Sequence, residues 1–157
     1  MTGALRVQSA GAGDAPLLHA LILRAFAEYA GRLDPPAGAN DETVLSIEHK
    51  LAEGGAFICR AGDVAHGCVF FARRADHLYV GRLSVPPEFR RRGIGDLLLQ
   101  QTERHATHLD LPSVRLRVRL ALGVLRAYYR KRGYAEIGLH SHAGYGAPTF
   151  VEMEKRL

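Results

Sequence analysis

The most informative segment of this chain is Leu83-Ser84-Val85-Pro86-Pro87-Glu88-Phe89-Arg90-Arg91-Arg92-Gly93-Ile94-Gly95-Asp96. It begins in an apolar, strand-like run, which the two prolines end because proline cannot donate to a β-ladder. Apolar residues at helical spacing follow the glycines. Gly93 and Gly95 can turn backbone amides toward a common point, and a helix starting there contributes free N–H groups and its positive dipole end. The segment therefore predicts an anion-binding turn between a strand and a helix.

Other interpretations of this segment fit less well. A P-loop requires Gly-Lys-Ser/Thr at its end, where this chain has Asp96-Leu97, and a dinucleotide fingerprint requires a glycine in place of Leu98. A nucleic-acid surface would spread basic residues over a face, often among aromatic residues, whereas these arginines are packed against a glycine turn. For the three arginines taken alone, a solvated charge cluster remains the plain alternative.

The composition is that of an ordinary globular protein. The chain has 157 residues, of which 47% are hydrophobic and 24% charged, and this predicts a single domain over residues 1–157. No apolar run reaches the ~18 residues of a membrane span, and the N-terminus lacks signal-peptide features, so a cytoplasmic protein is expected. The net charge of +5 permits a nucleic acid or an acidic small molecule as a partner. Cys59 and Cys68 are expected to be reduced, buried thiols.

Hydrophobic spacing predicts the order strand, two helices, three strands, helix, strand, helix, two strands. Strand–helix–strand units imply parallel pairing and hairpins imply antiparallel pairing, so this order predicts a mixed-sheet α+β layered fold. Loops are expected at 31–40 and 138–148. The expected strands are 5–7, 56–60, 64–71, 78–85, 114–120, a segment after 133–134, and 149–153, and the expected helices are 17–29, 41–53, 94–109 and 123–132.

The six residues from Arg90 to Gly95 resemble the Arg/Gln-x-x-Gly-x-Gly/Ala signature of the GNAT superfamily of acetyl-CoA-dependent N-acetyltransferases. The lead-in from Leu83 to Arg90 looks like that family too. So does Ala127-Tyr128-Tyr129-Arg130-Lys131-Arg132-Gly133-Tyr134, which matches the family's Tyr, three residues, then Gly-aromatic. The element order also fits, so the resemblance covers nearly the whole chain. It implies a mixed, mostly antiparallel sheet of about seven strands with a splayed central parallel pair, flanked by about four helices.

The resemblance implies acetyl-CoA as the cosubstrate. In that family the signature amides hold the pyrophosphate of coenzyme A, which here means the backbone from Arg91 to Asp96, with Arg90 and Arg92 as side-chain helpers. The pantetheine arm pairs with a bulged strand that splays from its neighbour, here through Leu83 and Val85, and a backbone N–H there can polarise the thioester carbonyl. The cofactor-binding residues carried over are Leu83, Ser84, Val85, Arg90, Arg91, Arg92, Gly93, Ile94, Gly95 and Asp96.

Tyr129 matches the family's tyrosine that protonates the departing thiolate. The alternative is an aromatic residue that packs the helix against the sheet. The family often has Asn seven residues earlier, where this chain has Leu122, and this departure removes one contact to the pantetheine region. No metal ion is expected.

The acceptor side is less determined by sequence. The two long loops are expected to frame it. Arg82 projects opposite to Leu83 and either binds an acceptor carboxylate or pairs with a nearby acid, and His142 is a second candidate for contact with the acceptor. The general base is left open among Glu28, Glu42, Glu48, His140 and His142.

Three arginines at alternate positions, Arg115, Arg117 and Arg119, form a one-sided row on a strand. A solvated face, a contact to an anionic acceptor and a dimer contact are all consistent with this row.

We therefore expect an N-acetyltransferase that transfers the acetyl group of acetyl-CoA to a primary amine of a small molecule or a protein, by direct attack in a ternary complex. A non-catalytic acyl-CoA-binding sensor and, with less support, an RNA-binding module remain as alternatives. No membrane partner is expected, a nucleic-acid partner is disfavoured, and a homodimer is left open.

Overall fold

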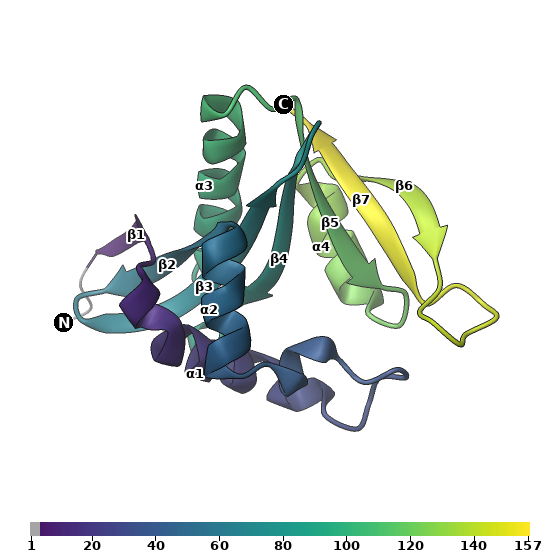
Figure 1. Ribbon diagram of the computed structural model, residues 1–157, viewed down its shortest axis with the longest axis horizontal. Coiled ribbons are helices and arrows are strands. Elements are labelled where there is room, and N and C mark those ends of the chain that lie inside the picture. Colours follow the sequence, from purple (N-terminus) through teal and green to yellow (C-terminus); the bar gives the residue numbers. More distant parts are fainter. Residues whose placement is uncertain (1–3) are drawn as a thin grey trace.

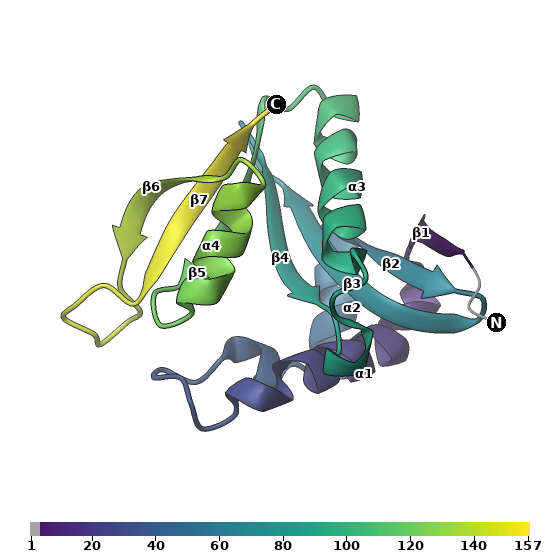
Figure 2. The same cartoon turned by 180° about the vertical axis from the view of Figure 1, so that it is seen from behind.

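Seven strands form one sheet with helices on both faces in the computed structural model, which describes residues 4–157 (Figures 1 and 2). Residues 1–3, which open the segment without signal-peptide features, lie outside the described residues. The strands are β1 (Leu5–Ser9), β2 (Gly55–Ala61), β3 (Val64–Arg73), β4 (Leu78–Ser84), β5 (Ser113–Arg119), β6 (Ala135–His140) and β7 (Phe150–Arg156). The helices are α1 (Ala15–Phe26), α2 (Val44–Glu53), α3 (Ile94–His108) and α4 (Gly123–Lys131).

The predicted order of elements is confirmed, and several boundaries differ by one to three residues. Helix α2 starts at Val44 rather than near Asp41 because Thr43 caps it: the Thr43 hydroxyl accepts from the backbone N–H of Ser46, and the Ser46 hydroxyl accepts from that of Thr43. The loop expected from Gly138 begins only after His140, because His140 still pairs with Phe150 of β7.

The sheet order is β1-β2-β3-β4-β5-β7-β6, and every neighbouring pair is antiparallel except β4–β5. The predicted mixed, mostly antiparallel sheet with a central parallel pair is thus confirmed. Strands β4 and β5 pair only at Leu78–Val114 and Tyr79–Arg115, and beyond this point they diverge (Figure 1). The divergence opens a gap in the middle of the sheet.

Strand β4 carries a bulge just where it leaves β5. Phe70 of β3 pairs with Gly81, but Cys68 pairs with Ser84, so β4 has one extra residue between these pairs. Arg82 lies in the bulge with a φ of 51°, a left-handed conformation that is uncommon for a residue with a side chain. The bulge redirects the backbone at the mouth of the gap.

Alternation along the strands divides the core between the two faces of the sheet. On β2, Phe57 and Cys59 pack toward α3 and α4, while Ala56 and Ile58 pack toward α1 and α2. Figures 1 and 2 show these helix pairs on opposite sides. Both cysteines are buried free thiols, as expected, and burial raises the pKa of Cys68 to about 12. None of the helices in residues 4–157 combines the length and apolarity needed to span a bilayer.

Candidate functional site

The turn between β4 and α3 has the conformation that its glycines predict. Arg91 and Gly93 have φ values of 64° and 77°, and α3 starts directly after Gly93 with no side chain capping its first turn. A Cβ atom at Gly93 would meet no atom within 4 Å, so the turn faces open space. Uncapped N–H groups at a helix start, next to left-handed residues, form an anion-binding concavity.

Arg90 uses its guanidinium to hold this turn in place. Its Nε donates to the carbonyl oxygen of Val85 at 2.9 Å, and its Nη2 donates to the carbonyl oxygen of Ala25 at 3.1 Å. The same group forms a 2.6 Å ion pair with Glu28. Arg90 therefore ties the turn to the end of β4 and to α1.

Arg91 and Arg92 are exposed, and within residues 4–157 neither has a carboxylate partner. The Arg92 guanidinium lies 5.7 Å from the centre of the Phe89 ring. The His66 ring stacks on the same Phe89 ring, with 3.9 Å between the ring centres. These two arginines leave their positive charge beside the concavity.

The first turn of α3 is joined to α4 by Asp96. Its carboxylate accepts hydrogen bonds from the Tyr128 hydroxyl at 2.7 Å and from Arg132, whose guanidinium also lies over the Tyr128 ring. The hydrogen bond from Arg132 is the main cause that holds the pKa of Asp96 below its ordinary value. This contact packs Tyr128 against Gly95, where an added Cβ atom would lie 2.6 Å from the Tyr128 hydroxyl oxygen.

Replacing Gly95 with alanine is expected to destabilise the fold by about 1 kcal/mol, although alanine normally stabilises a helix by a similar amount. The Cβ atom would displace Tyr128 from Asp96, and that hydrogen bond would be lost. Thermal unfolding measures the change. In a Tyr128→Phe background the clash is absent, so there Gly95→Ala should be neutral or stabilising, and an equal loss in both backgrounds would contradict this account.

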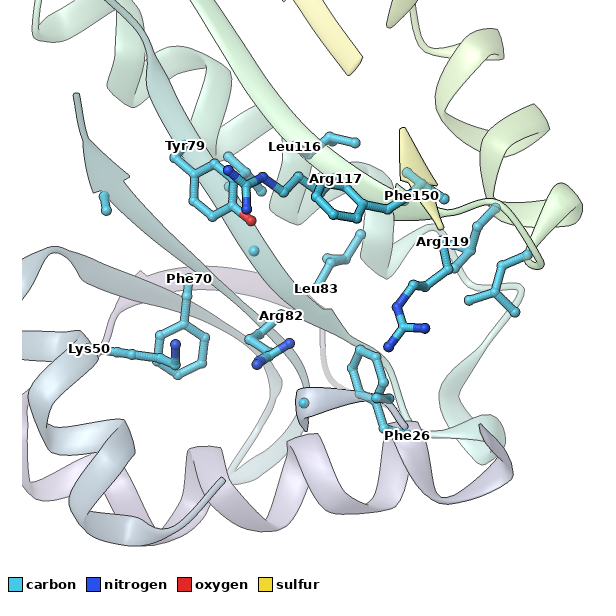
Figure 3. Close-up of a pocket in the computed structure, with 18 of the residues that line it drawn as sticks. Phe26, Lys50, Phe70, Tyr79, Arg82, Leu83, Leu116, Arg117, Arg119 and Phe150 are labelled. Carbon is cyan, nitrogen blue, oxygen red and sulfur yellow. The ribbon is translucent and has the colours of Figure 1, made fainter. Parts of the chain in front are cut away.

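A cavity of about 570 Å³ occupies the gap where β4 and β5 diverge (Figure 3). Leu83 of β4, Leu116 and Val118 of β5 and Tyr129 of α4 form part of its apolar wall. Neither Arg82 nor Leu83 has a register partner in the described sheet, and the Arg82 carbonyl accepts a hydrogen bond from the Ser84 hydroxyl at 2.9 Å. The backbone of β4 at Leu83 therefore lies next to an apolar wall without a partner on β5.

Tyr129 both packs in the core and lines this cavity. Its side chain is buried, with edge-on contacts to Tyr128 and Tyr134 at ring distances of 5.2 and 5.8 Å. Burial is the main cause that raises the pKa of its hydroxyl above the ordinary 10.0. The hydroxyl is thus protonated at neutral pH, and within residues 4–157 no hydrogen bond occupies it.

Arg82, a candidate for contact with the acceptor, pairs with an acid. Its Nε donates to Glu42 at 3.0 Å, and Glu42 also accepts from the Ser46 hydroxyl at 2.8 Å and lies 3.6 Å from Lys50. Burial alone would raise the pKa of Glu42, but the hydrogen bonds from Ser46 and Arg82 outweigh it and lower the pKa. Glu42 is therefore a weak base that anchors Arg82.

Of the five candidate bases, His142 alone lines the cavity. Glu28 is paired with Arg90, Glu48 is exposed on α2, and His140 is exposed beside Phe150. Burial is the main cause that lowers the pKa of His142 below 6.5, and Arg119 and Arg117 lower it further. His142 is accordingly neutral at pH 7 and able to accept a proton.

The two loops expected to frame the acceptor site contact each other. Tyr145 of the β6–β7 loop donates to Asp34 of the α1–α2 loop. Arg119 at the end of β5 donates to the carbonyl oxygen of Pro36 at 2.9 Å. The first contact joins the two loops. The second ties β5 to the α1–α2 loop at Pro36, which lines the cavity.

A family model described as the Acetyltransferase (GNAT) family matches residues 19–134, which is most of the chain. The chain belongs to the GNAT family. Its members transfer acetyl groups from acetyl-CoA to amines, and the resemblance recognised in the sequence is thereby confirmed. No curated protein matches the chain.

Solved structures of GNAT proteins share the fold at low sequence identity. The PaiA N-acetyltransferase of Thermoplasma acidophilum in complex with coenzyme A has a TM-score of 0.80 at 17% identity, over 98% of this chain and 99% of that one. The ribosomal-protein-S18-alanine N-acetyltransferase of Escherichia coli has a TM-score of 0.79 at 15% identity, over 98% of this chain and 94% of that one. A GNAT family acetyltransferase of Elizabethkingia anophelis with acetyl-CoA bound has a TM-score of 0.75 at 16% identity, over 98% of each chain.

Sequence patterns did not single out several residues that lie at this cavity. Phe26, Lys50, Arg74 and Tyr79 all line the cavity. Tyr79 lies on β4, the strand expected to pair with the pantetheine arm, and this placement could have identified it. The other three come from distant elements, and their approach to the cavity depends on tertiary packing.

Proposed function

We propose that this chain is an N-acetyltransferase that transfers the acetyl group of acetyl-CoA to a primary amine by direct attack in a ternary complex. The observation that carries the proposal is the cavity at the β4–β5 divergence. It is lined by Leu83, whose backbone has no partner on β5, and by Tyr129, whose neighbour Tyr128 packs against Gly95 at the start of α3.

The residues around the turn and β4 fit coenzyme A. The amides from Arg91 to Asp96 would hold the pyrophosphate, with the charges of Arg91 and Arg92 beside it. The backbone of Leu83 would pair with the pantetheine arm, since β4 has no strand partner there. The Val85 carbonyl already accepts from Arg90, so at Val85 only the N–H group is offered. Bound acetyl-CoA would supply an acetyl group activated as a thioester.

The chain's own groups supply proton transfer and polarisation. A primary amine has a pKa near ~10.4 and is protonated at pH 7, so it must lose a proton before it attacks. His142 is neutral and lines the cavity, and we assign it to accept this proton directly or through water. An unpaired backbone N–H of β4 polarises the carbonyl that the amine attacks. Tyr129 donates its hydroxyl hydrogen toward the departing sulfur atom.

The test is acetyl-CoA-dependent release of free CoA across a panel of amines, together with calorimetric titration of acetyl-CoA. Binding with amine-dependent CoA release is the expected result. Binding without CoA release for any amine would replace the proposal with an acyl-CoA sensor. RNA affinity that falls steeply with salt, with no acetyl-CoA binding, would replace it with an RNA-binding module.

Replacing His142 with glutamine is expected to lower kcat/KM by at least about 10-fold. This is below the roughly 10²- to 10⁴-fold usual for a general base, because water can take its place. The histidine is active when neutral, so wild-type kcat/KM should rise with pH through a pKa below 6.5 and level off near pH 7. The variant should lack this rise. His140→Gln serves as the control, since His140 does not line the cavity, and a pH profile unchanged by His142→Gln would remove His142 from the mechanism.

A further inference from the structure

We infer that the acceptor is a small amine that carries an anionic group, a carboxylate or a phosphate, and that Arg117 and Arg119 bind this group. The inference rests on the proposed acetyl transfer and specifies its acceptor. It follows from the charges that line the cavity, from how these two arginines are held, and from the loops that border them.

The cavity wall carries an excess of positive charge. One lining residue, Glu53, carries a carboxylate, and the other charged side chains are cationic. Just behind the wall, Glu42 is shared between Arg82 and Lys50, so one carboxylate serves two cations. A polyamine or another cationic acceptor would be repelled here, whereas an anionic amine would be attracted. The cationic residues that line the cavity are Lys50, Arg74, Arg82, Arg117 and Arg119.

Arg117 is held by two aromatic rings and by one long ion pair with Glu152. Its guanidinium lies 5.6 Å from the centre of the Tyr79 ring and 5.3 Å from that of Phe150 (Figure 3). Its contact with Glu152 is at 4.0 Å, beyond hydrogen-bonding distance. Rings against the faces of a guanidinium orient it and leave its N–H edge for a ligand. Arg117 is therefore preorganised to bind a carboxylate or phosphate.

Arg119 is the second cation at this place, and no carboxylate in residues 4–157 pairs with it. Its Nη2 donates to the Pro36 carbonyl, which leaves other N–H groups of the guanidinium free. Burial lowers the pKa of Arg119 from 12.5, and the nearby Tyr145 and Asp34 do not offset this. A partly buried cation without an ionic partner favours an anion beside it.

Arg115, two residues before Arg117 on the same strand, is different. Its Nε donates to Glu154 at 2.7 Å, it lies 3.7 Å from Asp76, and it does not line the cavity. The arginine row thus divides into one residue that is hydrogen-bonded to a carboxylate and two residues that line the cavity without such a bond. A merely solvated row would not require this difference.

The loops bordering the cavity favour a small acceptor over a polypeptide. Tyr145 bonds to Asp34, which joins the α1–α2 and β6–β7 loops, and Arg119 of β5 bonds to Pro36 of the first loop. An extended chain that entered between the two loops would have to break the first contact. A compact amine needs no such passage. The inference therefore commits to a small molecule, and acetylation of a peptide is an outcome that would overturn it.

The experiment compares amines that differ only in the anionic group: β-alanine with β-alaninamide, and O-phosphoethanolamine with ethanolamine, beside the common α-amino acids, spermidine and a short peptide. Binding is measured by calorimetry and turnover by CoA release. We expect at least one anionic amine to bind and to exceed its neutral counterpart by about 10-fold or more in kcat/KM. The carboxylate and phosphate pairs distinguish which anion the site accepts.

The decisive variants are Arg117→Gln with Arg119→Gln, and Arg115→Gln as the matched control from the same row. The double variant should lose the preference for the anionic amine by about 10- to 100-fold while it keeps acetyl-CoA affinity, and the control should keep both. Equal or better turnover of spermidine, a neutral amine or the peptide overturns the inference and leaves acetyl transfer standing. A preference for the anionic amine that survives in the double variant also overturns the inference. Absence of binding by every anionic amine does the same. Arginine-dependent binding of an anionic amine without CoA release supports the anion site and contradicts acetyl transfer.

Discussion

Replacing Tyr129 with phenylalanine is expected to lower kcat by about 10²- to 10⁴-fold and to leave the Kd of acetyl-CoA nearly unchanged. Tyr129 lines the cavity, and burial keeps its hydroxyl protonated by raising its pKa, so the hydroxyl can donate to the departing sulfur but cannot act as a base at neutral pH. Phenylalanine retains the ring that packs against Tyr128 and Tyr134. CoA release gives kcat, and calorimetry gives Kd.

Tyr134→Phe is the matched control for this variant. Tyr134 belongs to the same aromatic cluster, but its hydroxyl donates to Glu103 at 3.0 Å and does not line the cavity. Its loss should lower stability by about 1 kcal/mol without changing kcat. If Tyr129→Phe retained wild-type kcat, the tyrosine would be a packing residue and the departing sulfur would need another proton donor.

The parts of the fold that sequence predicts best are those set by local pattern. Alternation on β5 predicted its strand, and the glycine spacing predicted the turn before α3, since both depend on neighbours along the chain. Family resemblance added the splayed pair, which the β4–β5 register confirms.

What sequence could not predict are the partners of charged side chains. Arg82 could pair with an acid or bind a substrate, and the answer, Glu42, lies 40 residues earlier on a separate element. Arg90 resembled a phosphate ligand, yet its guanidinium reaches Ala25 on α1, 65 residues away. The arginine row on β5 is uniform in sequence, but its partners on β7 differ. Arg115 is hydrogen-bonded to Glu154, whereas Arg117 lies 4.0 Å from Glu152 and Arg119 is opposite Phe150. Such pairings depend on tertiary register, and no local pattern encodes them.

Replacing Gly93 with valine is expected to lower acetyl-CoA affinity by at least about 10²-fold without unfolding the protein. A β-branched residue is strained at a φ of 77°, at a cost of about 1–3 kcal/mol, which is less than the usual stability of a domain. The strain would rotate the amides at the start of α3, and the side chain would enter the open space that the turn faces. Hydrogen bonds to a charged group contribute roughly 1.5–3 kcal/mol each, so losing one or two accounts for the expected fall in affinity. Calorimetry measures affinity, and thermal unfolding measures stability.

Gly62→Val separates damage to the turn from backbone strain in general. Gly62 lies in the β2–β3 hairpin with a φ of 59°, and a Cβ atom there also meets nothing within 4 Å. The two substitutions therefore impose the same kind of strain in equally open surroundings, one at the start of α3 and one in a hairpin outside the cavity. Both variants should lose similar stability, but Gly62→Val should bind acetyl-CoA like the wild type. If Gly93→Val also bound it normally, the pyrophosphate would have to lie elsewhere, and the amides of this turn would no longer explain why the chain needs a left-handed glycine before α3.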